Sequence, residues 1–363
     1  MSKITFSYSV VFGCFLALSQ CVLADRLVQS AIQQAAPEKS LLLTISRAGK
    51  RLVAGGEQGV IIYSGDRALT WKQAEVPTST LITSLNFFDK QTGWAVGHDG
   101  VILGTKDGGL SWQKRLDGAV INQLRVDALE TEFNYQNSLG AVDADLLENL
   151  GYQLDDAKIA VEEGPSSPLL DIIFLDSLTG YAVGAYGLFL KTNDGGLSWV
   201  YEGYKLPNPD SLHLNRVIQT QAGHLLILGE AGLLIESLDN GGSWHKVELP
   251  YQGSLFSAVE ADSLYLMGLR GTVLKRTRDE LGSTVWNKID IGSTATINDA
   301  IVVDDIAYLV GQGGALLQKQ GEAFVPFQKR GLRSYSAVES VGQYLIVVGE
   351  GGVSRIDLNG GAD

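Results

Sequence analysis

Four short segments of this sequence place an aspartate next to glycines and ahead of a tryptophan, a combination that could form a catalytic or metal-binding loop. In "TKDGGLSWQ" (105–113), Asp107 is followed by two glycines and then by Trp112. Such a carboxylate could act as a general acid or base or ligate calcium. The other three pairs are Asp66 with Trp71, Asp194 with Trp199, and Asp239 with Trp244. What these aspartates do depends on the elements that position them.

Other residues that carry chemistry show no catalytic or metal-binding spacing. The four histidines are His98, His213, His224 and His245. None belongs to a zinc motif, and we found neither a nucleophile elbow nor a phosphate-binding loop. The adjacent His98 and Asp99 could form an acid–base pair, although such residues more often simply fill a hairpin turn. We therefore expect no metal and no cofactor.

The aspartate segments belong to a longer pattern that repeats along the chain. "GWAVGHDGVILGTKDGGLSW" (93–112) and "GYAVGAYGLFLKTNDGGLSW" (180–199) are two of its copies, and 52–71 and 225–244 are two more. In all four, the glycine that opens G-x-x-G precedes the tryptophan by 15 residues. Three weaker copies follow. The seven opening glycines are Gly56, Gly97, Gly184, Gly229, Gly268, Gly311 and Gly349.

The spacing of these copies predicts the fold. Successive opening glycines are 41, 87, 45, 39, 43 and 38 residues apart, which is close to the length of a propeller blade apart from one interval. Each copy reads as strand, tight glycine turn, strand, corner and strand, and a further apolar strand precedes it. We predict an all-β protein, a seven-bladed β-propeller with one helical or loop insertion.

The long interval contains the insertion, at 120–168. It could instead hide an eighth blade, but it lacks the V-G-x-x-G core and is rich in acids. Leu146, Leu147, Leu150 and Leu154 have helical spacing within it.

At the other end of the propeller, the last copy stops without its tryptophan strand. We therefore expect residues 25–40 to close the ring by pairing beside the last blade, within a propeller that spans 25–363.

The N-terminus and the overall charge indicate where the protein works. Residues 1–24 read as a secretory signal peptide, which predicts an exported, periplasmic protein. The alternatives are an uncleaved membrane anchor and a lipid anchor at Cys21. The second cysteine, Cys14, lies in the same segment, so the mature chain would have no disulfide. The net charge of −13 argues against binding nucleic acid or lipid directly, and we expect a monomer.

The four aspartate corners match the Asp-box, or BNR repeat, a motif first associated with sialidases. The carboxylate can accept N–H bonds across a turn, and the tryptophan can fill space between blades. Four equivalent corners around a ring cannot converge on one substrate, so we expect them to be structural. The corners join the third and fourth strands. The G-x-x-G turns and the connections between blades lie on the opposite face, where we expect ligands, with the insertion beside or over the central channel.

The repeats resemble those of the photosystem II stability/assembly factor family, most closely its exported relatives in non-photosynthetic bacteria. The resemblance rests on "GWAVGHDGVILGTKDGGLSW" and "GYAVGAYGLFLKTNDGGLSW" and covers about 41–355 apart from the insertion. It implies a non-enzymatic assembly or stability factor that binds a membrane or envelope protein. The family uses a basic patch, whereas this chain is acidic. The candidate partner-binding residues are Arg270, Lys329, Arg330 and Arg333.

Two other functions remain open from the sequence. A sialidase-like glycoside hydrolase would need an arginine cluster and a tyrosine nucleophile assisted by a glutamate. Tyr186 and Glu230 lie in G-x-x-G turns and could share a cleft, but the Arg-Ile-Pro motif that often accompanies Asp-boxes in sialidases is missing. The third possibility is an accessory ligand-binding propeller of an envelope assembly.

Overall fold

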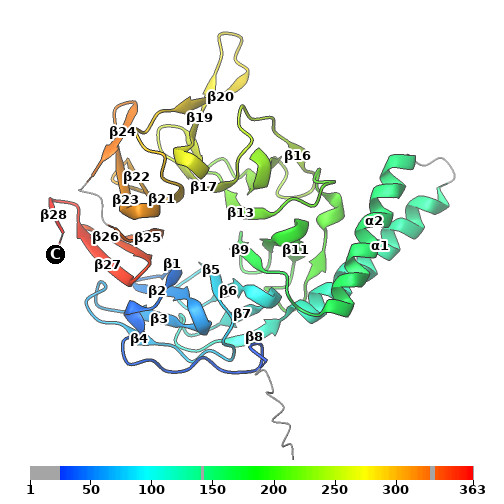
Figure 1. Cartoon of the computed structure of the whole chain (residues 1–363), viewed down its shortest axis with the longest axis horizontal. Helices are drawn as coiled ribbons and strands as arrows, with labels where there is room; N and C mark the ends of the chain where they lie inside the picture. The colour runs from blue at the N-terminus through cyan, green and yellow to red at the C-terminus, as the bar shows by residue number, and fades with distance from the viewer. Residues whose placement is uncertain (1–24, 140–142, 328–331, 363) are drawn as a thin grey trace, which may run out of the picture.

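In the computed structural model, seven four-stranded antiparallel sheets surround a central channel (Figure 1). The structure describes residues 25–139, 143–327 and 332–362, so the proposed signal peptide at 1–24 lies outside them. Each sheet is one blade, and its four strands follow one another in the sequence from the channel outwards. The predicted seven-bladed architecture is confirmed.

The blades are numbered in chain order. The first four blades are β1 (Leu42–Ala48), β2 (Arg51–Gly56), β3 (Ile61–Ser64) and β4 (Lys72–Gln73); β5 (Ile82–Phe87), β6 (Gly93–Gly97), β7 (Ile102–Thr105) and β8 (Gln113–Leu116); β9 (Leu169–Phe174), β10 (Gly180–Gly184), β11 (Phe189–Thr192) and β12 (Val200–Tyr201); and β13 (Leu214–Gln219), β14 (Leu225–Gly229), β15 (Leu234–Ser237) and β16 (His245–Lys246). The last three are β17 (Leu255–Glu260), β18 (Leu264–Gly268), β19 (Val273–Arg278) and β20 (Thr284–Ile289); β21 (Ile297–Val303), β22 (Ile306–Gly311), β23 (Ala315–Gln320) and β24 (Ala323–Pro326); and β25 (Tyr335–Val341), β26 (Tyr344–Gly349), β27 (Gly352–Asp357) and β28 (Gly361–Ala362).

The G-x-x-G turns pack each blade against the chain that enters it. His98 N–H donates to the carbonyl oxygen of Leu81 at 2.9 Å, and a Cβ on Gly97 would lie 2.1 Å from that same oxygen. Equivalent bonds occur in all seven blades. The second glycine of this turn, Gly100, has a φ of +67°, which is cheap only for glycine. The repeated glycines are therefore explained by close backbone approach and turn geometry.

The strand register identifies the aromatic side chains that fill the space between the fifth and sixth blades and the blade before each of them. Strand pairing places Trp286 opposite Arg276 and Phe324 opposite Lys319. Arg276 and Lys319 each lie eight residues after the opening glycine of their own blade, Gly268 and Gly311. The serine or threonine that opens each aspartate corner lies eight residues after its own glycine. Trp286 and Phe324 therefore occupy the position of the corner tryptophans in the fifth and sixth blades. The sequence pattern missed both because their corners differ in length.

Each of the four aspartate corners is held together by its own carboxylate. Asp194 Oδ1 accepts hydrogen bonds from the Thr192 hydroxyl at 2.8 Å, Leu197 N–H at 3.0 Å and Ser198 N–H at 2.9 Å. Its Oδ2 accepts the Ser198 hydroxyl at 2.6 Å. Asp66, Asp107 and Asp239 make closely similar sets. The hydrogen bond from the Ser198 hydroxyl lowers the pKa of Asp194 to about 2.

The lowered pKa gives a prediction for acid stability. A carboxyl whose pKa is lower in the folded than in the unfolded chain stabilises the fold above about pH 4, and this contribution is lost as the pH falls towards 2. Asp194→Asn should therefore lower the melting temperature by roughly 1–3 °C near pH 7, and the difference from wild type should shrink between pH 4 and pH 2. Thermal melts across pH measure this, with the exposed Asp210→Asn as control. A difference that persists unchanged at pH 2 would contradict it.

The predicted ring closure by strand pairing is wrong. The fourth strand of the last blade is β28, which comes from the C-terminal end of the chain. Residues 25–40, all described, form instead a strap along the outside of the first blade, with one 3-10 turn, η1 (Pro37–Lys39). The strap does reach the last blade, because η1 contacts β27 and a Cβ on Gly352 would lie 1.8 Å from the Glu38 carbonyl oxygen. Packing of the backbone therefore joins the two ends, and no strand is donated.

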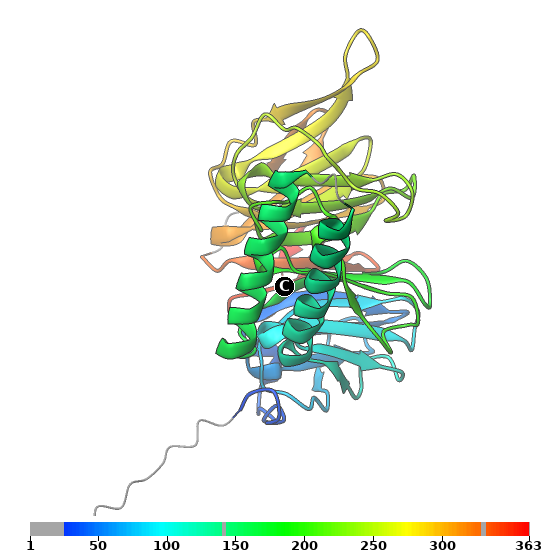
Figure 2. The same ribbon diagram turned by 90° about the vertical axis from the view of Figure 1, so that its right-hand side faces the viewer.

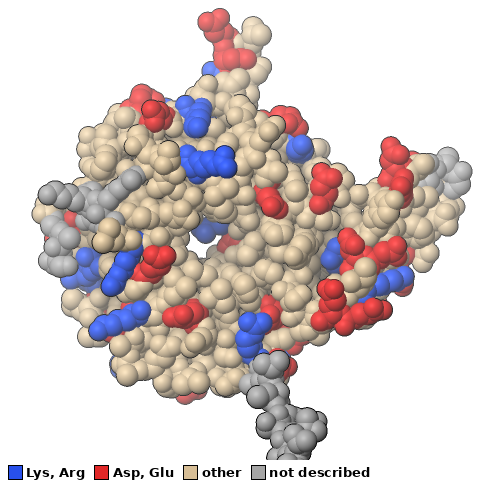
Figure 3. Space-filling view, in the orientation of Figure 1, with Lys and Arg blue, Asp and Glu red and all other residues tan. Residues whose placement is uncertain are grey.

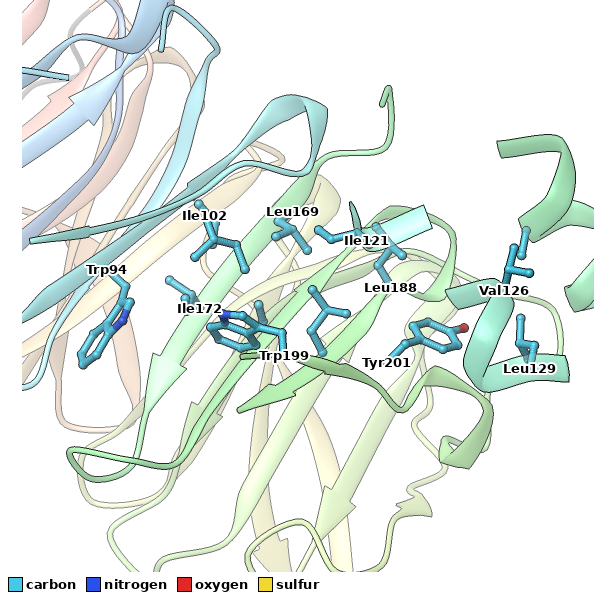
Figure 4. Packing of buried hydrophobic residues seen from close by; sticks show 14 of the residues in the cluster. Trp94, Ile102, Ile121, Val126, Leu129, Leu169, Ile172, Leu188, Trp199 and Tyr201 are labelled. Atoms are coloured by element: carbon cyan, nitrogen blue, oxygen red, sulfur yellow. The ribbon is translucent and has the colours of Figure 1, made fainter. Parts of the chain in front are cut away.

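The insertion is a pair of antiparallel helices, α1 (Gly118–Ser138) and α2 (Ala144–Glu163), so the helical expectation is confirmed. The hairpin leaves the second blade beside Asp99, but it then runs outwards along the rim of the third blade (Figures 1 and 2). The expected position beside or over the channel is therefore wrong. Val126 and Leu129 of α1 pack towards Tyr201 of β12 (Figure 4), and this apolar contact turns the hairpin away from the channel.

In the described part of the chain, neither helix has the length and apolar character needed to cross a membrane.

Candidate partner-binding face

The propeller has two faces with different structures. The turn face carries the seven G-x-x-G turns and the connections between blades. The corner face carries the aspartate corners and the turns between first and second strands. The turn-face 3-10 turns are η2 (Glu57–Gly59), η3 (His98–Gly100), η4 (Ala185–Gly187), η6 (Glu230–Gly232), η7 (Leu269–Gly271) and η8 (Gln312–Gly314). Figure 3 views the turn face, and the channel opens at its centre.

The structure places two of the four predicted basic contacts on the turn face. Arg270 is exposed in η7, where it has a φ of +56°. Arg333 is exposed in the connection that leads to β25, and its guanidinium lies against Gly351. Lys329 and Arg330 lie outside the described residues. Arg270 and Arg333 belong to the fifth and seventh blades, and Figure 3 shows the basic groups of this face separated from one another and mixed with acidic ones. The described residues therefore form no continuous basic patch.

Tyr186 and Glu230 lie near each other on the turn face, joined by His213. The Tyr186 and His213 rings are 4.9 Å apart, and His213 Nδ1 lies 3.9 Å from Glu230 Oε2. Glu230 also accepts the backbone N–H of His213 at 3.2 Å. Glu57 and Glu350 accept the corresponding N–H groups of their own blades. Glu230 thus makes a bond that recurs around the ring, whereas Tyr186 is 55 % exposed and available for contact.

A buried ion cluster that sequence reasoning missed spans the channel. Arg216 Nε lies 3.5 Å from Asp171 Oδ2, and Arg216 Nη2 lies 3.5 Å from Asp299 Oδ1. The three residues line a cavity of about 250 Å³. Each of the three lies directly after a β-bulge near the start of the innermost strand of its own blade. The seven residues at this position are Thr44, Ser84, Asp171, Arg216, Ser257, Asp299 and Ala337.

The two carboxylates of the cluster also connect neighbouring blades. Asp171 accepts the Ser84 hydroxyl at 2.6 Å from the second blade and Val217 N–H at 3.0 Å from the fourth. Asp299 makes the same two kinds of bond with Ser257 and Val338. Burial raises the pKa of Asp171 even though Arg216 stabilises its charge. Burial also opposes the charge of Arg216, but the two carboxylates outweigh it and raise the pKa of the guanidinium. The cluster therefore holds the inner ring together.

Most of the net negative charge of the chain comes from the helical hairpin. Residues 117–164 contain eleven acidic and two basic residues, so they contribute −9 to the net charge of −13. Figure 3 shows these acidic side chains gathered over the hairpin at the rim. The chemistry that this face offers is recognition: exposed tyrosine and arginine around a channel mouth, beside an acidic arm. Among the described residues, no group of three histidine, cysteine or acidic side chains is placed to hold a metal ion.

Comparison with known proteins identifies relatives of this chain. The sequence model of the photosynthesis system II assembly factor YCF48 family matches residues 64–139 and 156–347. The photosystem II assembly lipoprotein Ycf48 of Synechococcus sp. (strain CC9902) is 30 % identical over 135 residues, which cover 36 % of this chain and 39 % of that protein. The chloroplastic stability/assembly factor HCF136 of Cyanidioschyzon merolae is 39 % identical over 51 residues, 14 % of this chain and 12 % of that protein. The chain thus aligns with well under half the length of these relatives.

Solved structures show the same fold over nearly the whole chain. A structure described as YCF48 bound to D1 peptide has a TM-score of 0.61 at 15 % identity and covers 90 % of this chain and 94 % of its own. The WD40 propeller domain of Doa1 has a TM-score of 0.56 at 9 % identity and covers 91 % of this chain and 95 % of its own.

Proposed function

Because the chain belongs to the YCF48 family of photosystem II assembly factors, we propose that it is a non-enzymatic assembly or stability factor that binds an exported part of a membrane or envelope protein. Family membership is the observation that carries this proposal. The structure of YCF48 with a D1 peptide supports peptide recognition by that relative. In this chain, the proposed partner surface is the turn face, with Arg270, Lys329, Arg330 and Arg333 as contacts.

The proposed division of labour between the two faces rests on the corner geometry. We propose that the four aspartate corners are Asp-boxes with a structural role. In each of them the aspartate is occupied by hydrogen bonds within its own turn, which leaves no free carboxylate for substrate chemistry. The hydrolase alternative loses support at Glu230 as well, since that side chain caps a backbone N–H.

The proposed setting is the exported side of a membrane. Residues 1–24 would be a cleaved signal peptide, and the lipoprotein nature of the Synechococcus relative keeps a lipid anchor at Cys21 as the alternative. The acidic surface supports a protein partner over nucleic acid or a direct contact with lipid. We propose that the protein is a monomer, with the acidic hairpin as a second contact at the rim.

Affinity capture from solubilised membranes tests the proposed function. The mature protein should recover one membrane or envelope protein. Arg270→Ala together with Arg333→Ala should reduce its recovery at least tenfold, because exposed arginines at the centre of an interface commonly contribute 1–2 kcal/mol each, about a tenfold change in affinity per 1.4 kcal/mol. Arg67→Ala removes another exposed arginine, from the corner face, and should leave recovery unchanged. Equal recovery with all variants, or recovery of no such protein, would contradict the proposal.

A further inference from the structure

A cavity of about 630 Å³ lies between the fourth and fifth blades, on the corner face. Its floor is apolar and includes Leu226, Leu234 and Trp286. Its polar side includes His224, which directly precedes β14, Glu236 of β15, and Arg276 and Arg278 of β19. The volume is within the range of pockets that bind small organic molecules. This cavity opens on the face opposite the proposed partner surface.

The cavity lies where the fifth blade lacks an aspartate corner. In the second and fourth blades, by contrast, the corner covers the second strand of the preceding blade. Arg51 Nη1 donates to the carbonyl oxygens of Asp107 and Gly108, and the Tyr181 hydroxyl donates to the carbonyl oxygen of Asn240. In the fifth blade, β19 and β20 continue instead as a straight hairpin of six paired positions that projects from the ring (Figures 1 and 2). Leu226, which occupies in β14 the place of Tyr181 in β10, therefore has no corner above it.

The cavity carries an excess of positive charge within an acidic protein. Arg276 and Arg278 face a single carboxylate, that of Glu236. Arg276 Nη1 lies 4.0 Å from Glu236 Oε1, too far for a hydrogen bond, and His224 Nδ1 lies 3.5 Å from the same oxygen. Arg278 Nη1 donates to the Gly282 carbonyl oxygen at 3.0 Å. One guanidinium charge thus remains without a compensating carboxylate in the cavity wall.

The aromatic wall of the cavity is the ring of Trp286, which is partly exposed. The Nε1 atom of Trp286 is buried and does not reach the cavity, so the ring offers an apolar surface and no hydrogen-bond donor. An aromatic or alkyl group can pack on this surface while an attached anionic group meets the guanidinium groups of Arg276 and Arg278.

We propose that this cavity binds a small organic anion with an apolar body, such as an aryl or alkyl carboxylate or sulfonate. The apolar part packs on Trp286 and the leucines, and the anionic group lies between Arg276 and Arg278. An apolar pocket with a few converging polar groups is the usual form of such a site. Arginine favours carboxylate and sulfonate oxygens because its planar fork of N–H groups matches them.

Binding of 2-naphthoate to the protein is measured by titration calorimetry, and 2-naphthalenemethanol serves as the uncharged analogue. We expect one saturable site for the anion and at least tenfold weaker binding of the alcohol. Arg276→Gln with Arg278→Gln should weaken naphthoate binding at least tenfold, whereas Arg67→Gln, which removes a charge from another part of the same face, should leave it unchanged.

A further variant controls for the case in which the arginine substitutions disturb the fold. Thr284 is exposed at the start of β20 and lines the cavity, so Thr284→Trp should fill the opening without disturbing the strand. Its melting temperature should match that of wild type, and naphthoate binding should be abolished. Absence of saturable binding by the wild-type protein, or unchanged binding after Thr284→Trp or after the double arginine substitution, would overturn the proposal. Membrane-protein capture is a separate readout, because it depends on the opposite face.

Discussion

Replacing Arg216 with methionine is expected to lower the free energy of unfolding by about 3 kcal/mol at pH 7. The change leaves the carboxylates of Asp171 and Asp299 without their shared positive partner, while both are less than a tenth exposed. We place the loss at the low end of the range for a broken buried ion pair, because 35 % of the Arg216 side chain is exposed to the channel, where water screens the charges. Denaturant unfolding measures the effect.

The loss should depend on pH in a defined direction. Burial already raises the pKa of Asp171. Without Arg216 the pKa rises further, so the folded variant binds a proton more readily than the unfolded chain. A group whose pKa is raised in the folded state stabilises the fold at low pH and loses that contribution as the pH rises through the folded pKa. The difference between wild type and Arg216→Met should therefore grow as the pH is raised from about 4.

A matched control separates the cluster from a general charge effect. Lys72→Met removes one positive charge from an exposed position on β4 and should change stability by less than about 0.5 kcal/mol. Adding Asp171→Asn and Asp299→Asn to Arg216→Met should restore part of the lost stability, since the amide oxygens can still accept from Val217 and Val338 without a buried charge. A loss for Arg216→Met no larger than that for Lys72→Met would show that the cluster does not stabilise the ring.

Removing residues 25–40 is expected to lower the melting temperature by about 5–10 °C. The strap contacts three blades: Arg26 pairs with Asp99 at 3.0 Å, Ala31 N–H donates to Val76, and η1 meets β27. Leu27 is also buried in the core of the first two blades. Losing one large apolar side chain from the core and several hydrogen bonds costs about 4–6 kcal/mol, which for a chain of this size corresponds to a shift of that order.

Gly352 provides a sharper test of how the ring closes. Alanine at this position would have a φ of +89° and would place its Cβ against the Glu38 carbonyl oxygen. Gly321→Ala is the matched control, because Gly321 also has a positive φ but has open space around it. Gly352→Ala should cost at least 2 kcal/mol more than Gly321→Ala in the full chain. In the chain without 25–40 the two should cost the same. Equal costs in both chains would exclude the strap as the closing element.

The sequence by itself determined the blades and their two faces. The hydrogen bonds that define a corner join residues two to four apart, as between Asp194 and Ser198, and the strand pairing within a blade is equally local. A local pattern that recurs at a fixed period therefore specifies the blade, the position of its turns and the expectation of seven of them. The sequence did not predict that Glu230 caps the backbone N–H of His213. That contact and the equivalent ones of Glu57 and Glu350 became visible only in the structure.

Only the tertiary structure decided what happens between blades. Asp171, Arg216 and Asp299 meet across the channel although 83 residues separate the last two. No repeated charge marks them, because the same position carries threonine, serine or alanine in the other four blades. The hairpin runs outwards because its apolar side packs against Tyr201 and not towards the channel. The strap closes the ring because the Glu38 carbonyl oxygen lies close to Gly352. The cavity beside Trp286 lies where the fifth blade has a straight hairpin in place of a corner. Each of these contacts is set by how the ring closes, which brings together residues that the local sequence pattern does not connect.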